Sequence, residues 1–377
     1  MSNTLTALTP DLFEALDVVS RELVGFIPAV TLDAAAERAA VGQTIRVPIT
    51  PAASAEDVTP GTTPPDTGDQ VIGNAQLSIT KARTVPFRWT GEEQKGINTG
   101  PGYRAIRVQQ IAQAIRTLVN EVESDVALLY KRSSRAYGTA GTTPFATNLA
   151  EAAQVLKILK DNGAPEGDLH LIIGTTAGAN MRSLSQLNKA NEAGGDTLLR
   201  QGVLLNLFGL MIRESAQVKT HTKGTGANYQ VNHAAYAIGD TDITVDTGTG
   251  TIVAGDVVTG AGDTNKYIVG TALAANILSL NKPGLRAALA DNAALTVGNN
   301  YEANMAFHRS AMVLVARPPA LPEEGDMADD RMLVTDPRSG LTFEVAMYKQ
   351  YRRIRYEISL AWGASNIKPE HTAILLG

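Results

Sequence analysis

The sequence contains no cysteine. This absence excludes disulfide bonds, thiolate metal sites and cysteine nucleophiles. Whatever stabilises the folded chain, or any assembly that it forms, must therefore be noncovalent or use another kind of side chain.

Long apolar runs are also absent. No run in the sequence approaches the roughly 18 consecutive apolar residues that cross a bilayer as a helix. The first residues, MSNTLTALTPDLFEAL, have neither the basic region nor the apolar region of a secretory signal. We therefore expect a protein that folds in a cytoplasm and has no membrane partner.

The sequence has little excess of either charge, with a formal net charge of −5. A protein that wraps nucleic acid needs a clustered basic surface, so the charge argues against this class, whereas a weakly acidic wall past which DNA slides is allowed. Hydrophobic residues make up 44% of the chain and charged residues 19%, as in soluble globular proteins. Because 377 residues exceed the size at which a single core stops growing, we expect more than one lobe.

Recognisable catalytic and metal-binding patterns are missing. The glycine-rich GTGAN and DTGTGTI lack the lysine of a phosphate-binding loop, and no G-x-S-x-G elbow occurs. Asp240, Asp242 and Asp246 are spaced faintly like a calcium loop but lack its glycine and glutamate. We expect no enzyme, no cofactor and no metal. The histidines show no metal-ligand spacing, and we expect satisfied or exposed side chains, two of them (His221 and His233) in a loop region: His170, His221, His233, His308 and His371.

A basic run with interleaved tyrosines, YKQYRRIRYEI, could stack on nucleic acid. At strand spacing, however, Tyr348, Arg352 and Tyr356 share one face. We interpret the run as a strand that contacts another subunit or faces solvent.

The N-terminal stretch from Thr9 to Val30 reads as an amphipathic helix. Thr9 suits the N-cap, and Phe13 and Leu16 fall on its apolar stripe. Such a terminal helix packs as an arm on a neighbouring subunit or on its own core.

Two extended stretches follow, GQTIRVPIT and NAQLSITKARTVPFRW, separated by a Pro-, Thr- and Asp-rich tip. They predict one long two-stranded excursion. An isolated hairpin is marginally stable in water, so an arm with one apolar face needs something to lie on, either its own domain or a neighbouring subunit. The apolar residues of the second stretch share one parity, interrupted by Lys81 and Arg83: Leu77, Ile79, Val85, Phe87 and Trp89.

The strongest helical signal runs from Tyr103 to Arg135. Apolar residues recur there at steps of three and four, with no internal glycine or proline. At 1.5 Å per residue this helix would be about 50 Å long. Its acidic residues gather in the middle of the helix: Glu121, Glu123 and Asp125.

The rest of the chain predicts an α/β body interrupted by a β module. A helix over 148–162, the strand HLIIGTT, the helix TAGANMRSLSQLNKA and the strand LMIRESAQV alternate. From about Lys219 to Gly298, short strands separated by Gly, Asp and Asn turns indicate a small all-β module. The remaining segments, NMAFHRSAMVLVARPPALPE and FEVAMYKQYRRIRYEISLAWGASNIKPEHTAILL, predict strands that return to the α/β body.

This order of parts resembles the major capsid proteins of tailed bacteriophages, which have the Hong Kong 97-type fold. GVLLNLFGLMIRESAQV is similar to the coat-protein segment in which an apolar turn leads into a central strand. NMAFHRSAMVLVARPPALPE is similar to a strand with its Pro-rich exit, and RYEISLAWGASNIKPEHTAILLG to the closing strand. The β module resembles the insertion domain of short-tailed phages of the P-twenty-two type.

The resemblance implies an α+β fold with an N-terminal arm, an E-loop, a spine helix in a peripheral domain, an axial domain and an inserted β domain. In this sequence the expected parts are the arm (1–41), the E-loop hairpin (42–95), the peripheral domain (96–147), the first part of the axial domain (148–218), the insertion (219–299) and the axial return with the C-terminal strands (300–377).

The resemblance also implies a function. Copies of the chain would form pentamers and hexamers of an icosahedral shell around double-stranded DNA, without sequence-specific binding, together with a scaffolding protein and a portal protein. The shell would be part of the virion and would be assembled in the host bacterial cytoplasm. We expect no covalent crosslink, although Lys81 and Lys95 are possible donors. The residues expected to contact neighbouring subunits are Phe13, Leu16, Leu77, Ile79, Val85, Phe87 and Trp89.

Three other classes compete with this interpretation. An encapsulin-like compartment shell has the same fold but would be expected to lack the β module and to enclose an enzyme. A soluble α/β hydrolase with a β insertion requires a polar cleft of titratable groups, for which the sequence supplies no recognisable set. A tail-tube or adhesion protein is disfavoured by the long helix.

Overall fold

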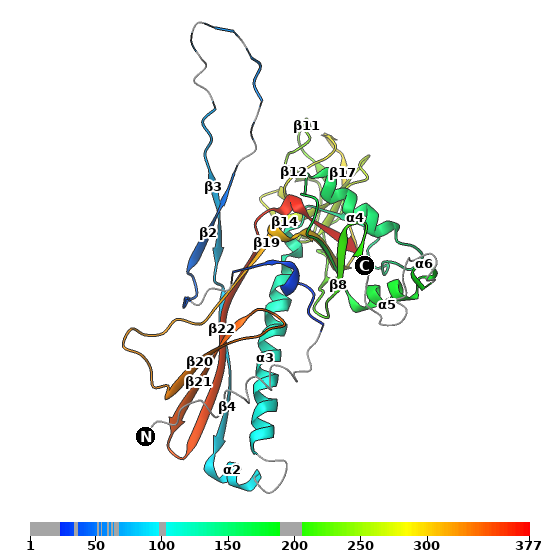
Figure 1. The fold of residues 1–377 in the computed structure, drawn as a ribbon. Coiled ribbons are helices and arrows are strands. Elements are labelled where there is room, and N and C mark those ends of the chain that lie inside the picture. Colours follow the sequence, from blue (N-terminus) through cyan, green and yellow to red (C-terminus); the bar gives the residue numbers. More distant parts are fainter. Residues whose placement is uncertain are drawn as a thin grey trace.

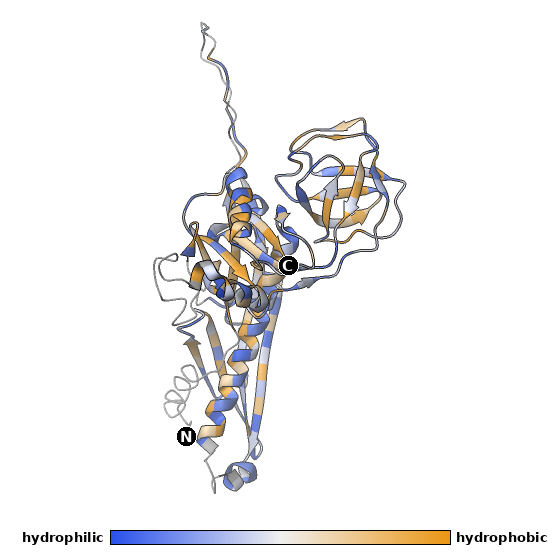
Figure 2. Cartoon of the chain, turned by 90° about the vertical axis from the view of Figure 1, so that its right-hand side faces the viewer, coloured by the Kyte–Doolittle hydropathy of each residue, from blue (hydrophilic) through white to orange (hydrophobic). Residues whose placement is uncertain are grey.

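A computed structural model describes residues 23–33, 37–50, 53, 55–58, 60–61, 63, 68–97, 103–188 and 206–377. A long helix lies beside an elongated sheet, an α/β body lies at one end of this helix, and a two-stranded hairpin projects beyond the body (Figure 1). Strands of the middle of the chain form a lobe set off from the rest (Figure 2). The α+β class predicted from the sequence is confirmed.

The long helix is α3, Tyr103–Ala127, which continues as the 3-10 helix η3, Leu128–Arg132. The predicted helix is confirmed but is shorter than expected, about 37 Å at the standard rise. It ends early because the chain tightens into η3 and then enters the strand β5, Arg135–Tyr137. The apolar stripe predicted from the sequence lies in the core, with these side chains buried: Val108, Ile111, Ile115, Leu118, Val119, Val122 and Val126.

A six-stranded sheet lies along α3. Its order is β1–β19–β22–β21–β20, and β4 pairs with the other side of β22. The indole Nε1 of Trp362 in β22 donates to the Asp125 carboxylate of α3 at 2.8 Å, and Lys81 of β4 lies 2.8 Å from the same carboxylate. The strands are β1 (Thr31–Asp33), β4 (Lys81–Thr90), β19 (Met312–Arg317), β20 (Asp330–Thr335), β21 (Thr342–Gln350) and β22 (Arg353–Asn366).

The predicted two-stranded excursion is wrong in its second limb. Only β2, Thr44–Ile49, and β3, Gly73–Ser78, form the hairpin, whereas all ten residues of β4 pair with β22. Lys81 and Arg83, which interrupt the apolar alternation, explain the departure because both form ion pairs with Glu121 of α3. The short helix α2, Gly91–Ile97, follows β4.

The α/β body contains the alternation predicted from the sequence. Helices α4 (Ala150–Asp161), α5 (Thr175–Ser183) and α6 (Ser185–Asn188) accompany β6 (Leu169–Ile173) and β8 (Leu210–Glu214). The predicted helix after β6 is divided into α5 and α6. Strand β18 (Tyr301–His308) lies between β6 and β23 (Thr372–Leu376), and β5 pairs in parallel with β23. The hairpin strand β7 (Asn206–Leu207) completes this edge of the sheet.

The β-rich region between Thr220 and Val297 has a hydrophobic cluster of its own, which includes Val231, Val245 and Leu278. Its sheet is continuous with that of the α/β body, because β14 pairs with β5 and β9 pairs with β18. Its strands are β9 (Thr220–His221), β10 (Tyr229–Val231), β11 (Ala235–Tyr236), β12 (Asp242–Asp246), β13 (Val257–Gly260), β14 (Lys266–Ala274), β15 (Ile277–Leu280), β16 (Leu289–Ala290) and β17 (Ala294–Val297).

Two further expectations differ from the structure. The described end of the predicted N-terminal helix, residues 23–30, contains only the 3-10 helix η2, Ile27–Ala29, because the chain turns there into β1. The rest of that helix lies outside the described residues. The predicted return of residues 300–377 to the α/β body holds for β18 and β23, but β20, β21 and β22 lie in the sheet beside α3. The short turns η4 (Arg309–Ala311) and η5 (Pro369–His371) connect these strands.

The packing of α3 predicts a large effect of truncating Leu118, which is 1% exposed. Leu118→Ala should lower the free energy of unfolding by about 2–5 kcal/mol, because it removes buried methyl groups and leaves a cavity. The exposed Gln113→Ala on the same helix is the matched control and should change it by less than about 0.5 kcal/mol. Urea unfolding of unassembled subunits measures both values, and equal values would contradict the described packing of α3.

Candidate functional site

The described residues hold no arrangement typical of catalysis. No three acidic, histidine or cysteine side chains gather there closely enough to hold a metal ion. None of the helices in this part of the chain combines the length and apolarity needed to cross a membrane. The features that stand out instead are buried polar junctions that fix the segments against one another, and surfaces that the chain leaves exposed.

The first junction is the Glu123 carboxylate of α3, which is fully buried. It accepts hydrogen bonds from the backbone N–H groups of Gly25, Phe26 and Ile27 at 2.6, 2.7 and 2.9 Å. It also accepts one from the hydroxyl of Ser215 at 2.7 Å. A Cβ atom on Gly25 would lie 2.7 Å from the carbonyl oxygen of Glu214, so only glycine fits there. The carboxylate therefore joins α3, the N-terminal segment and the end of β8.

Burial raises the pKa of Glu123, and the hydrogen bonds from Phe26, Ile27, Ser215 and Gly25 oppose this shift without cancelling it. All four donors are neutral groups. The negative charge is thus held by oriented dipoles, an arrangement that depends on the N-terminal segment keeping its position.

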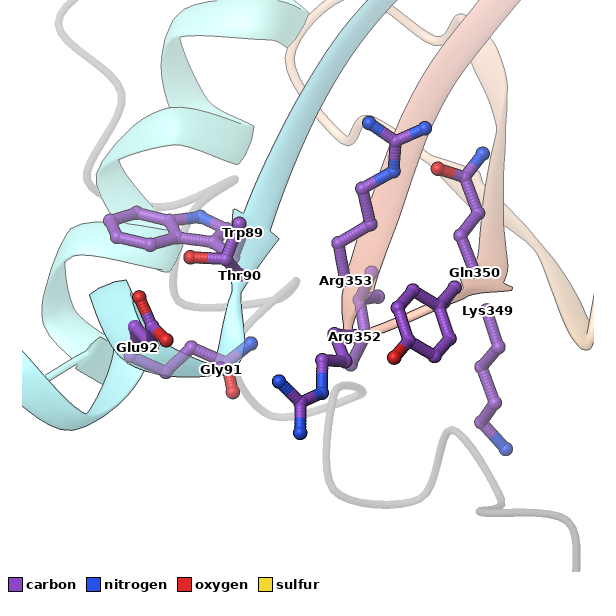
Figure 3. A pocket seen from close by; sticks show the side chains of 11 residues that line it. Trp89, Thr90, Gly91, Glu92, Lys349, Gln350, Arg352 and Arg353 are labelled. Carbon is purple, nitrogen blue, oxygen red and sulfur yellow. The ribbon is translucent and has the colours of Figure 1, made fainter.

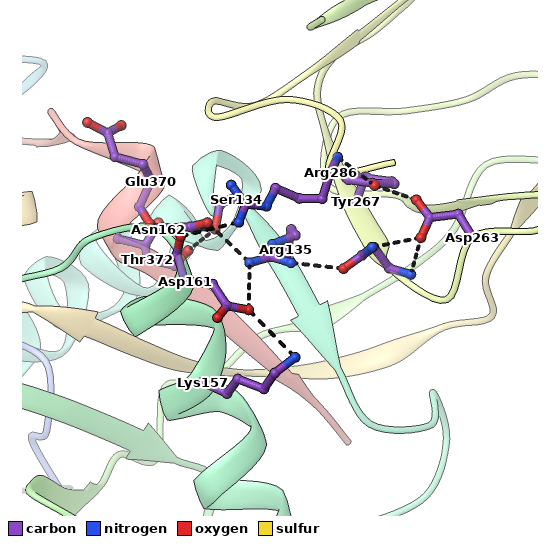
Figure 4. Close-up of polar contacts among 11 residues, drawn as sticks. Ser134, Arg135, Lys157, Asp161, Asn162, Asp263, Tyr267, Arg286, Glu370 and Thr372 are labelled. Atoms are coloured by element: carbon purple, nitrogen blue, oxygen red, sulfur yellow. Dashed lines mark hydrogen bonds and ion pairs between the residues drawn. The ribbon is translucent and has the colours of Figure 1, made fainter. Parts of the chain in front are cut away.

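The second junction surrounds Arg135 of β5 (Figure 4). Its guanidinium donates to Asn265 of the β-rich region at 2.8 Å and to Asn162 at 3.1 Å, and it lies 3.7 Å from Asp161. Asn162 in turn donates to the carbonyl oxygen of Glu370 at 2.8 Å. One buried cation therefore ties α4, β5 and the β-rich region together, and burial lowers its pKa.

The third junction is formed by His221, which is buried and has hydrogen-bond partners, but lies in β9 and not in a loop region as predicted. Its Nδ1 lies 2.8 Å from the hydroxyl of Tyr130, and its Nε2 lies 2.8 Å from the Asp256 carboxylate. Tyr301 donates to the carbonyl oxygen of Gly255 at 2.6 Å. Burial raises the pKa of Tyr130 to about 12. Because His221 and Asp256 are almost completely covered, we interpret this chain of hydrogen bonds as a junction, not a catalytic relay.

The other histidines contribute no site. His170 in β6 is buried, neither of its ring nitrogens has a hydrogen-bond partner in the described structure, and burial lowers its pKa to about 4. His308 accepts from the backbone N–H of Ser310, and His233 stacks on Tyr236. His308 and His371 meet edge to face with ring centroids 6.4 Å apart.

The structure divides the predicted contact residues into three groups. Leu77 and Ile79 are buried within this chain against β19 and β22, so they have no free surface for a neighbour. Trp89 is also mostly buried and donates to Gln110 at 2.7 Å. Val85 and Phe87 are half-buried and line a groove of about 350 Å³ against α3, which leaves them available. Phe13 and Leu16 lie outside the described residues.

Sequence reasoning missed the most exposed apolar side chains of the hairpin. Val58, Val71 and Ile72 are 97%, 87% and 68% exposed. They lie in the Pro-, Thr- and Asp-rich tip, beyond the six residue pairs of β2 and β3. The signal that could have revealed them is the presence of apolar residues in a polar loop that has no core to enter.

The Glu123 junction predicts a specific dependence of stability on pH. Because the folded pKa of Glu123 is raised, the folded chain binds its proton at a higher pH than the unfolded chain does. Stability from this group is therefore present below the unfolded value of about 4.5 and is lost as pH rises through the folded value. Relative to Glu123→Gln, the wild-type chain should become less stable as pH rises across this window. Exposed Glu92→Gln is the control, and parallel stability curves for wild type and Glu123→Gln would contradict the assignment.

Comparisons with known proteins identify the fold. No protein-family model and no curated protein matches the sequence. Among solved structures, a chain from the capsid structure of cyanophage P-SCSP1u matches with a TM-score of 0.53 at 14% identity, covering 94% of this chain and 88% of that chain. A chain from Mycobacterium phage Che8 matches with a TM-score of 0.50 at 13% identity, covering 94% and 91%. The chain therefore has the fold of phage capsid chains, as its resemblance to the Hong Kong 97-type coat proteins predicted.

Proposed function

We propose that the chain is a major capsid protein, which self-assembles into the icosahedral shell that encloses the double-stranded DNA of a tailed phage. The observation that carries the proposal is the projecting hairpin of a chain with the capsid fold. Its tip exposes Val58, Val71 and Ile72, and a two-stranded hairpin alone is marginally stable in water. A neighbouring copy is the surface on which such an arm would rest.

The buried junctions suit this role. A closed shell requires each subunit to present its contact surfaces at fixed angles, since small errors in angle accumulate around a ring. Glu123, Arg135 and His221 each join segments that are far apart in the sequence. They hold the N-terminal segment and the β-rich region against α3 and the α/β body.

The finer assignments belong to the same proposal. The β-rich region is the inserted domain, and residues 42–95 supply the E-loop and the strand that anchors it. The subunits form pentamers and hexamers, with a scaffolding protein and a portal protein as partners, in a virion assembled in the host bacterial cytoplasm. A net charge of −5 suits a wall that encloses DNA without binding its sequence. The role is structural and non-enzymatic.

The hairpin tip provides the direct test. Wild-type protein, purified with and without the products of neighbouring genes, should form closed shells, tubes or rings by negative-stain electron microscopy. Val71→Asp with Ile72→Asp should reduce the assembled fraction at least about tenfold. The reason is that both substitutions remove apolar surface that would be buried against a neighbouring copy, and place a charge there. Val71→Leu with Ile72→Leu preserves the apolar surface and should assemble. A wild-type chain that stays monodisperse and small under every condition would overturn the proposal.

The shell should be free of covalent bonds between subunits. The amine of Lys81 lies 2.8 Å from the Asp125 carboxylate and 3.5 Å from that of Glu121, and such a paired ammonium is a poor nucleophile. Shells boiled in detergent should therefore migrate as a single monomer band. A ladder of multimers on the denaturing gel would refute this expectation, and Lys81→Arg with Lys95→Arg would show whether either lysine forms the bond.

A further inference from the structure

A pocket of about 780 Å³ lies at the end of the sheet beside α3, far from the projecting hairpin (Figures 1 and 3). Trp89, Gly91 and Glu92 line one side, where β4 leads into α2. The other side is formed by the turn that joins β21 to β22, with Tyr351 and Arg352, and by the start of β22, with Arg353 and Ile354. The pocket thus has apolar and aromatic walls, and its charged lining groups are Arg352, Arg353, Lys349 and the carboxylate of Glu92.

The turn presents charge that the described part of the chain does not neutralise. Arg352 and Arg353 are exposed and form no ion pair in the described part of the chain, although Arg352 lies 5.9 Å from the ring of Tyr351. In contrast, neighbouring Lys349 pairs with Asp329 at 2.7 Å. Tyr351 is 89% exposed, and Arg352 has a φ of 55°, a backbone conformation that favours glycine or asparagine. Joining β21 to β22 does not by itself require an exposed tyrosine or an arginine in this backbone conformation. These side chains therefore suit contact with a partner.

Unpaired negative charge lies on the loop between β19 and β20. Glu323 and Glu324 are exposed and form no ion pair within the described residues. Met327 is 88% exposed. Asp326 is occupied, because it forms an ion pair with Arg331 and accepts a hydrogen bond from the Tyr348 hydroxyl at 2.9 Å. The loop therefore offers two free carboxylates and one long apolar side chain.

These two surfaces complement each other. The carboxylates of Glu323 and Glu324 match the two free arginines, and Met327 suits the aromatic and aliphatic walls of the pocket. Both surfaces lie at the same end of the sheet, since Asp330 at the start of β20 pairs with Met347, close to the turn. Within one chain, Asp326 and Asp329 tie the loop to Tyr348 and Lys349 at the end of β21. Glu323, Glu324, Arg352 and Arg353 nevertheless form no ion pair within the described residues.

We propose that the pocket receives the loop of a second copy of this chain, with Glu323 and Glu324 on Arg352 and Arg353 and with Met327 against the apolar wall. The inference rests on the proposed function, because it names a contact between subunits of the shell. The loop of one copy and the pocket of the next are different surfaces, so the contact is heterologous (head to tail). Repeated contacts of this kind close when the copies form a ring. Its arginine–carboxylate pairs set the register between copies.

The absence of cysteine from the natural sequence allows a direct test of the contact. One chain carries Glu324→Cys and a second, differently tagged chain carries Arg353→Cys. After mixing and mild oxidation, mixed disulfide dimers should exceed either homodimer. A control pair, Lys160→Cys with Lys282→Cys, lies on other exposed surfaces and should give only the random yield. Mixed dimers no more abundant than in this control would overturn the inference.

Charge reversal provides the second measurement. Arg352→Glu with Arg353→Glu, and separately Glu323→Arg with Glu324→Arg, should each lower the assembled fraction about tenfold or more, because like charges would meet across the contact. The fourfold variant restores opposite charges and should recover assembly, whereas Lys160→Glu with Lys282→Glu should leave it unchanged. Normal assembly of both reversed variants would refute the contact.

The two tests separate this inference from the proposed function. Shells that form without mixed dimers and tolerate charge reversal would leave the capsid role standing and the contact refuted. Mixed dimers from a chain that never forms shells would support the contact and overturn the capsid role.

Discussion

The Glu123 carboxylate is the interaction on which the arrangement of the whole chain depends. It lies in the middle of α3, and its four donors come from the N-terminal segment and from the residue that follows β8. Burying a carboxylate without a cation is costly, and removing the acceptor would leave three backbone N–H groups without a partner at about 1–3 kcal/mol each. The position of the N-terminal segment is therefore specified by charge and direction as well as by apolar area.

Apolar packing and polar junctions make different contributions to the fold: the first supplies attraction between segments, and the second fixes their orientation. One large hydrophobic cluster covers α3 and the adjoining strands, and it reaches the β-rich region through Val257 and Ile268. The β-rich region also has a separate cluster of its own. Apolar contacts tolerate small rotations, whereas a guanidinium such as that of Arg135, with hydrogen bonds to two segments, does not. The junctions thus convert attraction between lobes into a defined orientation.

Local sequence pattern was enough to predict α3, α4 and β8, which bury a repeating stripe or face, and β6, which is a short apolar run buried on both faces. It could not predict the partner of β4, since alternation looks the same whether a strand pairs with its neighbour in sequence or with β22 near the C-terminus. The sequence groups Glu123 with Glu121 and Asp125 in the middle of the helix and does not by itself distinguish it from them. Its position between Val119 and Val126 on the apolar face was the available sign of burial. The unpaired charges of the β21–β22 turn could not be predicted from the sequence, because the sequence does not show which neighbouring charges pair with one another in the fold.

Strand β5 is only three residues long, yet it connects two bodies. One edge pairs with β14 of the β-rich region and the other with β23 of the α/β body. A related chain without residues 219–299 would leave this edge of β5 open, and would also uncover the stretch of β18 that β9 pairs with. Open edges recruit foreign strands. A chain of this fold that lacks the region would therefore need other residues at β5 and β18 to cover or pair these two edges.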